Sequence, residues 1–550
     1  MISAAKETIA VLKANGITRL FGNPGTTELA LLDATVSQGI DFHLCLHEGA
    51  AVAMADGFGR ATGTTGVVIV HTSVGTANTL TNLINVRSDA QPLLVIAGDK
   101  DDRLGGRGCF CEVPDLPGLV RQVTKEAWRV TLPEKLPELT LRALKVARAP
   151  TPGPVFIAAP ENHMAAELPA DAVGQHARRA TAVDLRAHPD HLRSILTALE
   201  SARRPLLIAG NEVGASGAAA LLAELAVTLC VPVVGEEVFT SNSLNFPTTH
   251  ALYHGNFSPD LEVVRDADLV VAVGARLFME YAYPAKPYLP PGLRLLQIGA
   301  DAAELGKIYP AELAVLGEVG AAIRDMHSML ASEMKPRPNV PAERRARATR
   351  DVAKMARHFS AAHPGTLHPE QLLGAMQAVV PGDAVIVDES VLSKDLMQRH
   401  ALLAGARRYF GTSGGGLGWG IPAAIGVQLA LPGRRVIAFV GDGGALFNLQ
   451  SLWTAAHLCL PVVIVVVNNG GYMAVRRGLG QLEGESLRTG RFPGSFITEP
   501  KINFCQLAAG LGVQAITVRR ADETANALRW ALELGAPALL DVRTTSSVYY

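Results

Sequence analysis

The most constraining feature of this chain is a set of short apolar runs, each of which ends in glycine and polar residues. The clearest is VVIVVVNNGGY (462–472), in which six Val and Ile residues precede two asparagines and two glycines. A run of this kind without polar alternation is typical of a strand that is buried on both faces, as in a parallel sheet. The chain must therefore fold so that helices cover both faces of such sheets.

Predicted strands and helices alternate within three blocks of the 550 residues. More than one domain is expected, because a chain of this length is too long for one hydrophobic core. We predict domains at 1–165, 185–335 and 365–550, with a charged, proline-containing linker at 336–364. The alternation predicts an α/β protein with three doubly wound parallel-sheet domains. Such sheets bind ligands at the carboxyl ends of their strands.

The composition excludes several classes of protein. The formal net charge of −1 gives no basic surface for nucleic acid or acidic membranes. The first residues lack the apolar core of a signal peptide, and no apolar stretch approaches the roughly 18 residues of a membrane-spanning helix. Six cysteines are too few for a disulfide framework. We expect a cytoplasmic protein with a small-molecule substrate.

Polar residues follow two consecutive strands of the third block. The strand VIAFVGDGG (436–444) ends at Asp442, and the next strand ends at Asn469, 27 residues later. The ends of parallel strands meet at one edge of a sheet, and a carboxylate, a carboxamide oxygen and a backbone carbonyl suit Mg²⁺ or Ca²⁺. The neighbouring glycines and the start of a helix near Ala445 suit a phosphate group. The pattern predicts a site for a metal-bound diphosphate.

The segment 441–469 resembles the thiamine-diphosphate motif, which begins with GDG and ends with NN. The resemblance extends to LFGNPGT (20–26), GGLGWGIPAAIGVQLA (415–430) and SLWTAAH (451–457), and identifies the chain as a member of the superfamily of acetolactate synthases and benzoylformate decarboxylases. It implies a pyrimidine-binding domain, a central Rossmann-like domain and a diphosphate-binding domain, in that order. It also implies that the two cofactor-binding halves come from different subunits, so we expect at least a homodimer, and a homotetramer as is usual in this family.

The same resemblance implies the cofactors and their ligands. Thiamine diphosphate and Mg²⁺ (or Ca²⁺) are expected, while FAD is allowed by the family but not expected. The metal ligands would be Asp442, Asn469 and the carbonyl oxygen of Gly471. The other residues expected at the diphosphate are Gly443, Gly444, Tyr472 and Ser390.

Two further cofactor contacts follow from the glycine-rich segment 415–420. Leu417 matches the bulky apolar residue that lies beneath the cofactor in this family, and the carbonyl of Gly415 would accept a hydrogen bond from the 4′-amino group. A glycine-rich turn before a helix would give the same pattern. Val391 and Leu392 stand where the family has hydroxyl groups, so either Ser390 or Ser393 would serve at the diphosphate, or no hydroxyl group would.

The candidate acid of the first block is Glu48, in LCLHEGAAVAMADGF (44–58). A buried glutamate at a strand end could keep N1′ of the pyrimidine protonated. A glutamate in the first turn of a helix that interacts with the helix dipole would look the same. The family pattern E-x-x-A-x-x-x-A-D-G favours the catalytic role, and it is matched by Glu48, Ala51, Ala55, Asp56 and Gly57.

His71 and Thr26 are the candidates for substrate chemistry. His71 matches an active-site histidine of benzoylformate decarboxylases and would act as a general acid. Thr26 matches a serine that holds the substrate carboxylate. A second histidine of that family aligns with Tyr281, and tyrosine, with an ordinary pKa of about 10, is a poorer proton shuttle at neutral pH.

The substrate pocket is expected to include residues from two loops as well. Phe110 and Cys111 take the places of substrate-contacting residues of acetolactate synthases. Arg476 and Arg477 could hold an extra anionic group of the substrate, or could belong to a solvated surface loop. The full predicted pocket is Thr26, Phe110, Cys111, Tyr281, Arg476 and Arg477.

These features predict a thiamine-diphosphate-dependent lyase that decarboxylates 2-keto acids without oxidation, through an enamine intermediate. The alternative is an acetolactate synthase-like carboligase or a 2-hydroxyacyl-CoA lyase, because the same enamine supports each reaction. A flavin-containing oxidase would need FAD in the middle domain, where LIAGNEVGASGAAA (207–220) has only a weak glycine pattern. A non-catalytic protein of this fold is disfavoured because Glu48, Leu417, Asp442 and Asn469 are all retained.

Overall fold

The structure is a computed structural model that describes residues 2–169, 174, 185–279, 283–284, 286–333, 342–349, 367–400 and 409–545. The chain forms two compact units. The first unit contains residues 1–182, 386–390 and 412–550, and the second contains residues 183–385 and 391–411.

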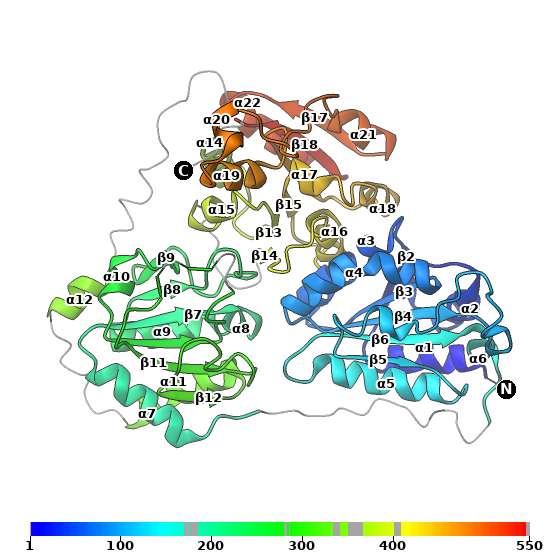
Figure 1. Cartoon of the computed structure of the whole chain (residues 1–550), viewed down its shortest axis with the longest axis horizontal. Helices are drawn as coiled ribbons and strands as arrows, with labels where there is room; N and C mark the ends of the chain where they lie inside the picture. The colour runs from blue at the N-terminus through cyan, green and yellow to red at the C-terminus, as the bar shows by residue number, and fades with distance from the viewer. Residues whose placement is uncertain are drawn as a thin grey trace. The chain divides into compact units, whose positions relative to one another are not determined.

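A six-stranded parallel sheet forms the first block (Figure 1). Its strands are β1 (Arg19–Asn23), β2 (Asp41–Leu44), β3 (Gly66–Val70), β4 (Leu93–Asp99), β5 (Glu126–Arg129) and β6 (Pro154–Pro160), in the spatial order β2-β1-β3-β4-β6-β5. Figure 1 shows α1 (Ala4–Ala14) and α5 (Lys135–Arg148) on one side of it, and α3 (Glu48–Thr62) and α4 (Thr72–Ser88) on the other. β3 is buried along its whole length, because helices cover both faces.

The third block repeats the topology of the first. Its strands are β13 (Val385–Glu389), β14 (Tyr409–Gly411), β15 (Val436–Gly441), β16 (Val463–Asn468), β17 (Gln514–Val518) and β18 (Ala538–Arg543), in the order β14-β13-β15-β16-β18-β17. The strand order is the same in the two sheets when β1 to β6 are matched, in sequence, with β13 to β18. β3 therefore corresponds to β15, and α3, which follows β2, corresponds to α16 (Gly420–Ala430), which follows β14.

The central block has a different sheet order, β12-β11-β10-β7-β8-β9. Its strands are β7 (Pro205–Ala209), β8 (Val233–Gly235), β9 (Tyr253–Asn256), β10 (Leu269–Val273), β11 (Arg294–Gly299) and β12 (Leu313–Leu316). Part of the predicted linker packs onto this block as α12 (Ala342–Ala348). Arg344 of α12 is buried and donates hydrogen bonds to the carbonyl oxygens of Leu199 and Leu229, which lie at the ends of α7 (Pro189–Ser201) and α9 (Ala219–Leu229).

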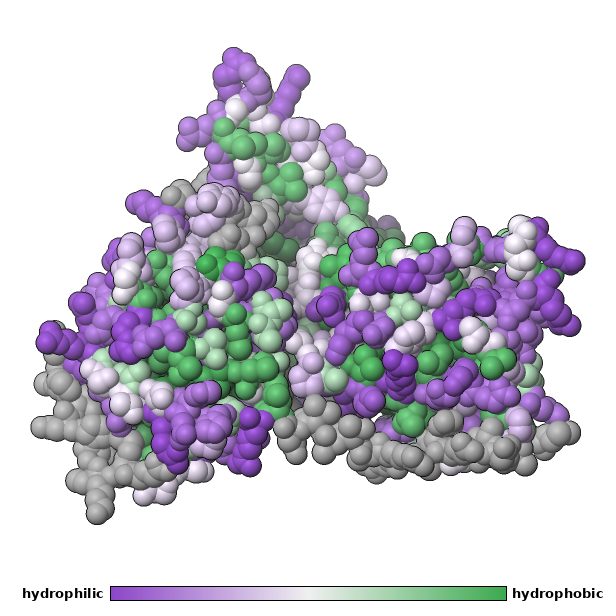
Figure 2. Space-filling model, turned by 60° about the horizontal axis from the view of Figure 1, so that its bottom comes forward, coloured by the Kyte–Doolittle hydropathy of each residue, from purple (hydrophilic) through white to green (hydrophobic). Residues whose placement is uncertain are grey.

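The predicted fold class of three doubly wound parallel sheets is confirmed. Within the described residues, no helix combines the length and apolarity that a membrane span requires. Figure 2 shows hydrophilic and hydrophobic side chains interspersed on the visible face.

Helices α3 and α16 join the first and third blocks within one unit, and their backbones come very close. A Cβ atom on Gly57 would lie 2.2 Å from the carbonyl oxygen of Ala423, and one on Gly426 would lie 2.0 Å from that of Met54. Glycine is required at both positions because any side chain would overlap the facing backbone.

A buried charged network lies beside this helix pair. Arg60 of α3 forms ion pairs with Asp56 at 2.8 Å and with Asp89 at 2.7 Å. The indole N–H of Trp419 donates to Asp56 at 2.8 Å, and the backbone N–H of Ser413 donates to Asp89 at 2.9 Å. Burial raises the pKa of Asp56, an effect that Arg60 opposes. Removing Arg60 would take the ion-pair partner away from two buried carboxylates.

We expect Gly57→Ala to separate α3 from α16 and to lower the free energy of unfolding by about 1–3 kcal/mol, because the added methyl group overlaps backbone atoms. Gly433→Ala is the matched control, since a Cβ there would meet no atom within 4 Å. Chemical denaturation of both variants measures the difference. Equal stability of the two variants would contradict the packing described here.

His43 of β2 is a buried histidine in the first sheet. Its ring centroid lies 5.3 Å from that of Phe21 on β1, and its Nε2 has no hydrogen-bond partner. Burial, followed by the charge of Arg19, lowers the pKa of His43 from 6.5 to about 4. The fold therefore favours the neutral ring.

The folded state keeps its full stability with respect to His43 above pH 6.5 and loses stability as the pH falls towards 4. The reason is that His43 of the unfolded chain takes up a proton at a higher pH than His43 of the folded protein. We expect His43→Phe, which keeps an aromatic ring, to reduce the loss of stability between pH 7 and pH 5 by about 1 kcal/mol, after allowance for solvent screening. Thermal unfolding of both proteins at these pH values tests this. An equal loss in the two proteins is the contrary result.

Candidate active site

Asp442 and Asn469 lie at the carboxyl ends of neighbouring strands. β15 and β16 pair in parallel, and each of the two residues directly follows its strand. Asp442 Oδ2 accepts a 2.9 Å hydrogen bond from the backbone N–H of Gly470. One end of the Asn469 carboxamide lies 3.3 Å from Asp442 Oδ1 and 2.8 Å from the carbonyl oxygen of Gly471. The three groups predicted to bind a metal are thus brought together.

This carboxamide has two orientations. With its nitrogen towards Asp442 and Gly471 it donates to both, and with its oxygen there three oxygens converge. The second arrangement suits a hard divalent cation. The described residues contain no group of three His, Cys, Asp or Glu side chains that could hold a metal, so such an ion would depend on amide and carbonyl oxygens. Burial raises the pKa of Asp442 to about 6.

The first asparagine of the pair has a structural role. Asn468 is buried at the end of β16, and its Nδ2 donates a 2.8 Å hydrogen bond to Asp541 of β18. Its backbone carbonyl accepts from the N–H of Thr544 at 2.9 Å. The two carboxamides therefore have different roles. Asn468 links β16 to β18 by a hydrogen bond, and Asn469 faces the carboxylate of Asp442.

Glycines near Asp442 allow neighbouring groups to come close to the backbone. A Cβ on Gly443 would lie 2.4 Å from the ring of Tyr472, and one on Gly471 would lie 2.0 Å from the carbonyl oxygen of Ser495. The third, Gly470, has a φ of 80°, a conformation that favours glycine. Backbone of this kind lets a phosphate group approach closely.

The glycine-rich loop that carries Leu417 is fastened to the first block. Asn85 of α4 accepts from the N–H of Gly416 and donates to its carbonyl oxygen, both at 2.9 Å. Leu417 is half-buried in this loop, and Gly415 is exposed with a φ of 76°.

A buried glutamate at the end of β13 holds the other side of this loop. The carboxylate of Glu389 accepts hydrogen bonds from the backbone N–H groups of Gly418 at 2.5 Å and Gly420 at 2.7 Å. Burial raises the pKa of Glu389 to about 7, although these hydrogen bonds act in the opposite direction. The loop is thus fixed by side chains from two blocks.

Glu48 begins α3 at the edge of the first sheet. It is 6% exposed, and it accepts hydrogen bonds from Asn23 at 3.1 Å and Asn78 at 2.9 Å. Asn23 is the last residue of β1, and Asn78 lies on α4. Two carboxamides, rather than a lysine or arginine, therefore orient this carboxylate.

His71 directly follows β3, and its Nδ1 faces the interior. Nδ1 lies 3.0 Å from the hydroxyl of Thr27 and 3.2 Å from the carboxylate of Glu28, while the side chain is 19% exposed. The next residue, Thr72, is buried and has a φ of 42°, which is strained for a β-branched residue by about 1–3 kcal/mol. Strain of this kind is often found at functional sites.

Several other predicted site residues lie in loops or, like Thr26, in the short helix Thr26–Glu28. Thr26 is exposed, whereas its neighbour Thr27 makes the contact to His71. The carbonyl oxygen of Cys111 accepts a 2.8 Å hydrogen bond from Ser73, two residues after His71, so this loop lies beside the histidine. Phe110 is 76% exposed. Tyr281 lies outside the described residues.

Two of the remaining predicted residues, Ser390 and Arg476, contact other side chains of the chain. The hydroxyl of Ser390 donates a 2.6 Å hydrogen bond to Asp388. The guanidinium group of Arg476 lies 5.1 Å from the ring centroid of Phe492 and 5.3 Å from that of Phe496. Arg477 is half-buried.

Known proteins match this chain along most of its length. Three sequence models fit in order: the thiamine pyrophosphate enzyme N-terminal TPP binding domain at 2–118, the central domain at 192–326 and the C-terminal TPP binding domain at 393–542. The benzoylformate decarboxylase of Pseudomonas aeruginosa is 30% identical over 538 residues, which cover 97% of each chain. The chain belongs to the thiamine pyrophosphate enzymes.

Two further relatives are similar to this thiamine pyrophosphate enzyme over most of its length. The large subunit of acetolactate synthase isozyme 3 from Escherichia coli is 29% identical, over 97% of this chain and 92% of that one. The solved structure of the thiamine diphosphate-dependent 4-hydroxybenzoylformate decarboxylase from Rhodococcus jostii RHA1 is 32% identical, with a TM-score of 0.88 over 99% of this chain and all of that one. The predicted superfamily is confirmed.

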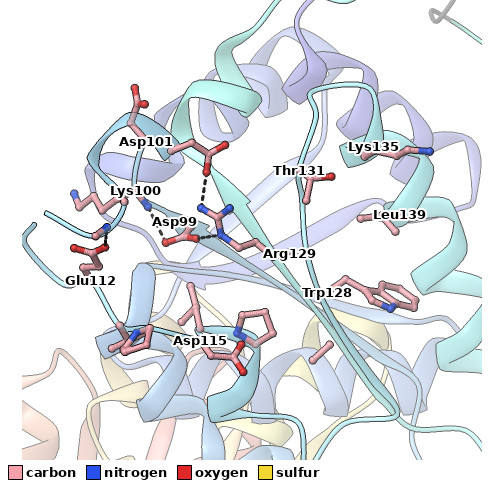
Figure 3. A pocket seen from close by; sticks show the side chains of 18 of the residues that line it. Asp99, Lys100, Asp101, Glu112, Asp115, Trp128, Arg129, Thr131, Lys135 and Leu139 are labelled. Atoms are coloured by element: carbon pink, nitrogen blue, oxygen red, sulfur yellow. Dashed lines mark hydrogen bonds and ion pairs between the residues drawn. The ribbon is translucent and has the colours of Figure 1, made fainter. Parts of the chain in front are cut away.

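A cavity of about 1160 Å³ lies beside β4, β5 and α5, and its lining is drawn in Figure 3. Arg129, one of the lining residues, pairs with Asp99 at 2.7 Å and with Asp102 at 2.6 Å. Glu48, His71 and Asp442 are not among the lining residues. The acid–base and metal-binding candidates of this thiamine pyrophosphate enzyme therefore lie outside the cavity lining, whereas Cys109 and Glu112 of that lining flank the predicted pocket residues Phe110 and Cys111.

Sequence reasoning missed four residues that orient the predicted site. Asn23 and Asn78 hold Glu48, and Thr27 and Glu28 hold His71. One signal for Glu28 was available in the sequence. Glu28 follows Gly25 by three residues at the start of a short helix, and this is the spacing of a capping box.

The two neighbouring asparagines of this thiamine pyrophosphate enzyme make a matched pair for mutation. We expect Asn468→Leu to lower the free energy of unfolding by about 1–2 kcal/mol, because buried Asp541 loses a hydrogen bond. We expect Asn469→Leu to leave stability nearly unchanged but to weaken Mg²⁺ binding at least tenfold. Denaturation and calorimetric titration with Mg²⁺ and thiamine diphosphate measure both effects. The opposite pattern would contradict the division of roles.

Proposed function

We propose that this thiamine pyrophosphate enzyme decarboxylates 2-keto acids. The observation that carries the proposal is that Glu48 and His71 lie at the carboxyl edge of one sheet, each held by hydrogen-bonding partners. A carboxylate and an imidazole at the same edge supply the acid–base pair that this chemistry needs. Benzoylformate decarboxylases among the relatives support the same class of reaction.

In this proposal the third block holds the diphosphate end of the cofactor. Asp442, Asn469 and the carbonyl oxygen of Gly471 would hold Mg²⁺ (or Ca²⁺), which would neutralise charge on the diphosphate. The backbone of Gly443 and Gly444, together with Tyr472 and Ser390, would hold the phosphate groups.

The thiazolium and pyrimidine rings would contact the glycine-rich loop and the first block. Leu417 would support the cofactor from below, and the carbonyl of Gly415 would accept from its 4′-amino group. Glu48 would hold a proton at N1′ of the pyrimidine. When bound, thiamine diphosphate supplies a carbon nucleophile for the keto group and an acceptor for the electrons that CO₂ leaves behind.

Residues of this chain would then handle the substrate. Thr26 would donate a hydrogen bond to its carboxylate, and His71 would deliver a proton from Nε2 to the carbon that has lost CO₂. The R group of the substrate would meet Phe110 and Cys111, with Arg476, Arg477 and Tyr281 as further predicted contacts.

We propose a cytoplasmic homotetramer, with the homodimer as the minimum unit.

A carboligase is the second candidate, because acetolactate synthases also match nearly the whole chain. In that reaction the carbon that has lost CO₂ attacks a second carbonyl compound instead of taking a proton. The two candidates are separated by the product: free aldehyde in one case, and a 2-hydroxyketone or acetohydroxy acid in the other.

The test is CO₂ release and product analysis with a panel of aromatic, branched aliphatic and dianionic 2-keto acids, in the presence of thiamine diphosphate and Mg²⁺. We expect Glu48→Gln to lower kcat by about 10²–10⁴-fold, because a general acid contributes that much. Glu138→Gln, on the exposed face of α5, is the control and should retain activity. An active Glu48→Gln variant would overturn the mechanism, and no CO₂ from any keto acid would overturn the proposed function.

A further inference from the structure

A buried carboxylate lies directly behind the ring of His71. Glu28 is fully buried in the short helix Thr26–Glu28, and its Oε2 lies 3.2 Å from Nδ1 of His71. The same oxygen accepts a 2.8 Å hydrogen bond from the backbone N–H of Gly25. The hydroxyl of Thr27 donates to the other oxygen, Oε1, and also lies 3.0 Å from Nδ1 of His71. The four groups form one connected hydrogen-bond network.

The hydrogen-bonding capacity of these groups determines the tautomer of His71. An ionised carboxylate can only accept, so Gly25, Thr27 and His71 must each donate to Glu28. Because Thr27 uses its proton on Glu28, its oxygen can accept from Nδ1 as well. All the contacts are satisfied when Nδ1 carries the proton. Nε2 is then the ring nitrogen available for exchange of a proton outside this network.

Two glycines make room for this arrangement. A Cβ on Gly25 would lie 2.3 Å from Nδ1 of His71, and one on Gly98 of β4 would lie 1.7 Å from Oε1 of Glu28. Residues from β4, from the loop after β1 and from the end of β3 therefore enclose the contact between the carboxylate and the imidazole. The strained backbone of Thr72 fixes the chain immediately after the histidine.

We propose that Glu28 is the positioning residue for His71: its carboxylate fixes the Nδ1–H tautomer, aims Nε2 away from the network, and stabilises the ring when it carries a positive charge. The catalytic part of this inference rests on the proposed function of His71. A carboxylate behind an imidazole has this effect in other acid–base sites.

The first test uses the ligand-free protein, so that it does not depend on turnover. Nitrogen-15 NMR of protein with labelled histidine rings, with the His71 signals assigned by their loss in His71→Ala, reports which ring nitrogen carries the proton. We expect a dominant Nδ1–H form in the wild-type protein and a mixture in Glu28→Gln, because an amide has only one acceptor oxygen, so either Thr27 or the pair Gly25 and His71 would face its N–H donors. Glu7→Gln, another buried glutamate of the same sheet domain, is the control and should leave the His71 signals unchanged.

The second test uses kinetics with an active 2-keto acid. We expect Glu28→Gln to lower kcat roughly 10–100-fold with KM changed less than about threefold, because proton delivery is impaired and binding is not. Added to His71→Ala, the same substitution should cause no further loss, since it acts only through the histidine. Gly98→Ala, which displaces the carboxylate without changing its chemistry, should reproduce the effect of Glu28→Gln.

Different outcomes separate this inference from the proposed function. An unchanged His71 tautomer in Glu28→Gln, or a further loss of activity in the double variant, would overturn the positioning role. Full activity of His71→Ala would instead overturn the proposed function of that histidine, while a changed tautomer would still support the structural part of the inference.

Discussion

The close contact of α3 with α16 is the interaction on which the rest of the first unit depends. Gly57 and Gly426 let the two backbones touch, and the network of Arg60, Asp56 and Asp89 lies beside the contact. Burying three charges has a large desolvation cost, which is offset only because each charged group has partners of opposite charge or hydrogen-bond donors. The ion pairs all lie within the first block, and the third block contributes the N–H groups of Trp419 and Ser413, so a shifted register between the two sheet domains would take these hydrogen bonds away from buried carboxylates.

This contact also explains a sequence pattern that we first associated with catalysis. Of the residues in the pattern that begins at Glu48, Asp56 and Gly57 serve the helix–helix interface: Asp56 pairs with Arg60 and Trp419, and Gly57 faces the backbone of Ala423. The pattern thus joins an active-site candidate and an interface on one helix. The glutamate at its start is held in place by the packing of the helix that follows it.

The strands and the metal-site candidates could be predicted because each leaves a local signal. Continuous Val and Ile runs mark buried strands, and polar residues directly after them mark the binding edge of a sheet, as for Asp442 and Asn469. Among the orienting residues, Glu28 shows only a capping-box spacing after Gly25, and nothing in the sequence links Asn23 or Asn78 to Glu48. Asn23, Asn78 and Glu28 are 25, 30 and 43 positions from the side chains they hold, and only the fold brings them together. A helix such as α12, whose buried arginine binds helix ends of the central block, looks in sequence like a charged linker.

The matching strand orders of the first and third sheets have a further consequence. α3 and α16 occupy equivalent places, and Met54 faces Gly426 while Gly57 faces Ala423, so the contact has the form of an isologous dimer interface within a single polypeptide. Because both halves share one chain, their effective concentration is set by the connection and not by how much protein is present. Dilution that separates subunits of an assembly leaves this interface closed, so each polypeptide keeps both of its sheet domains joined.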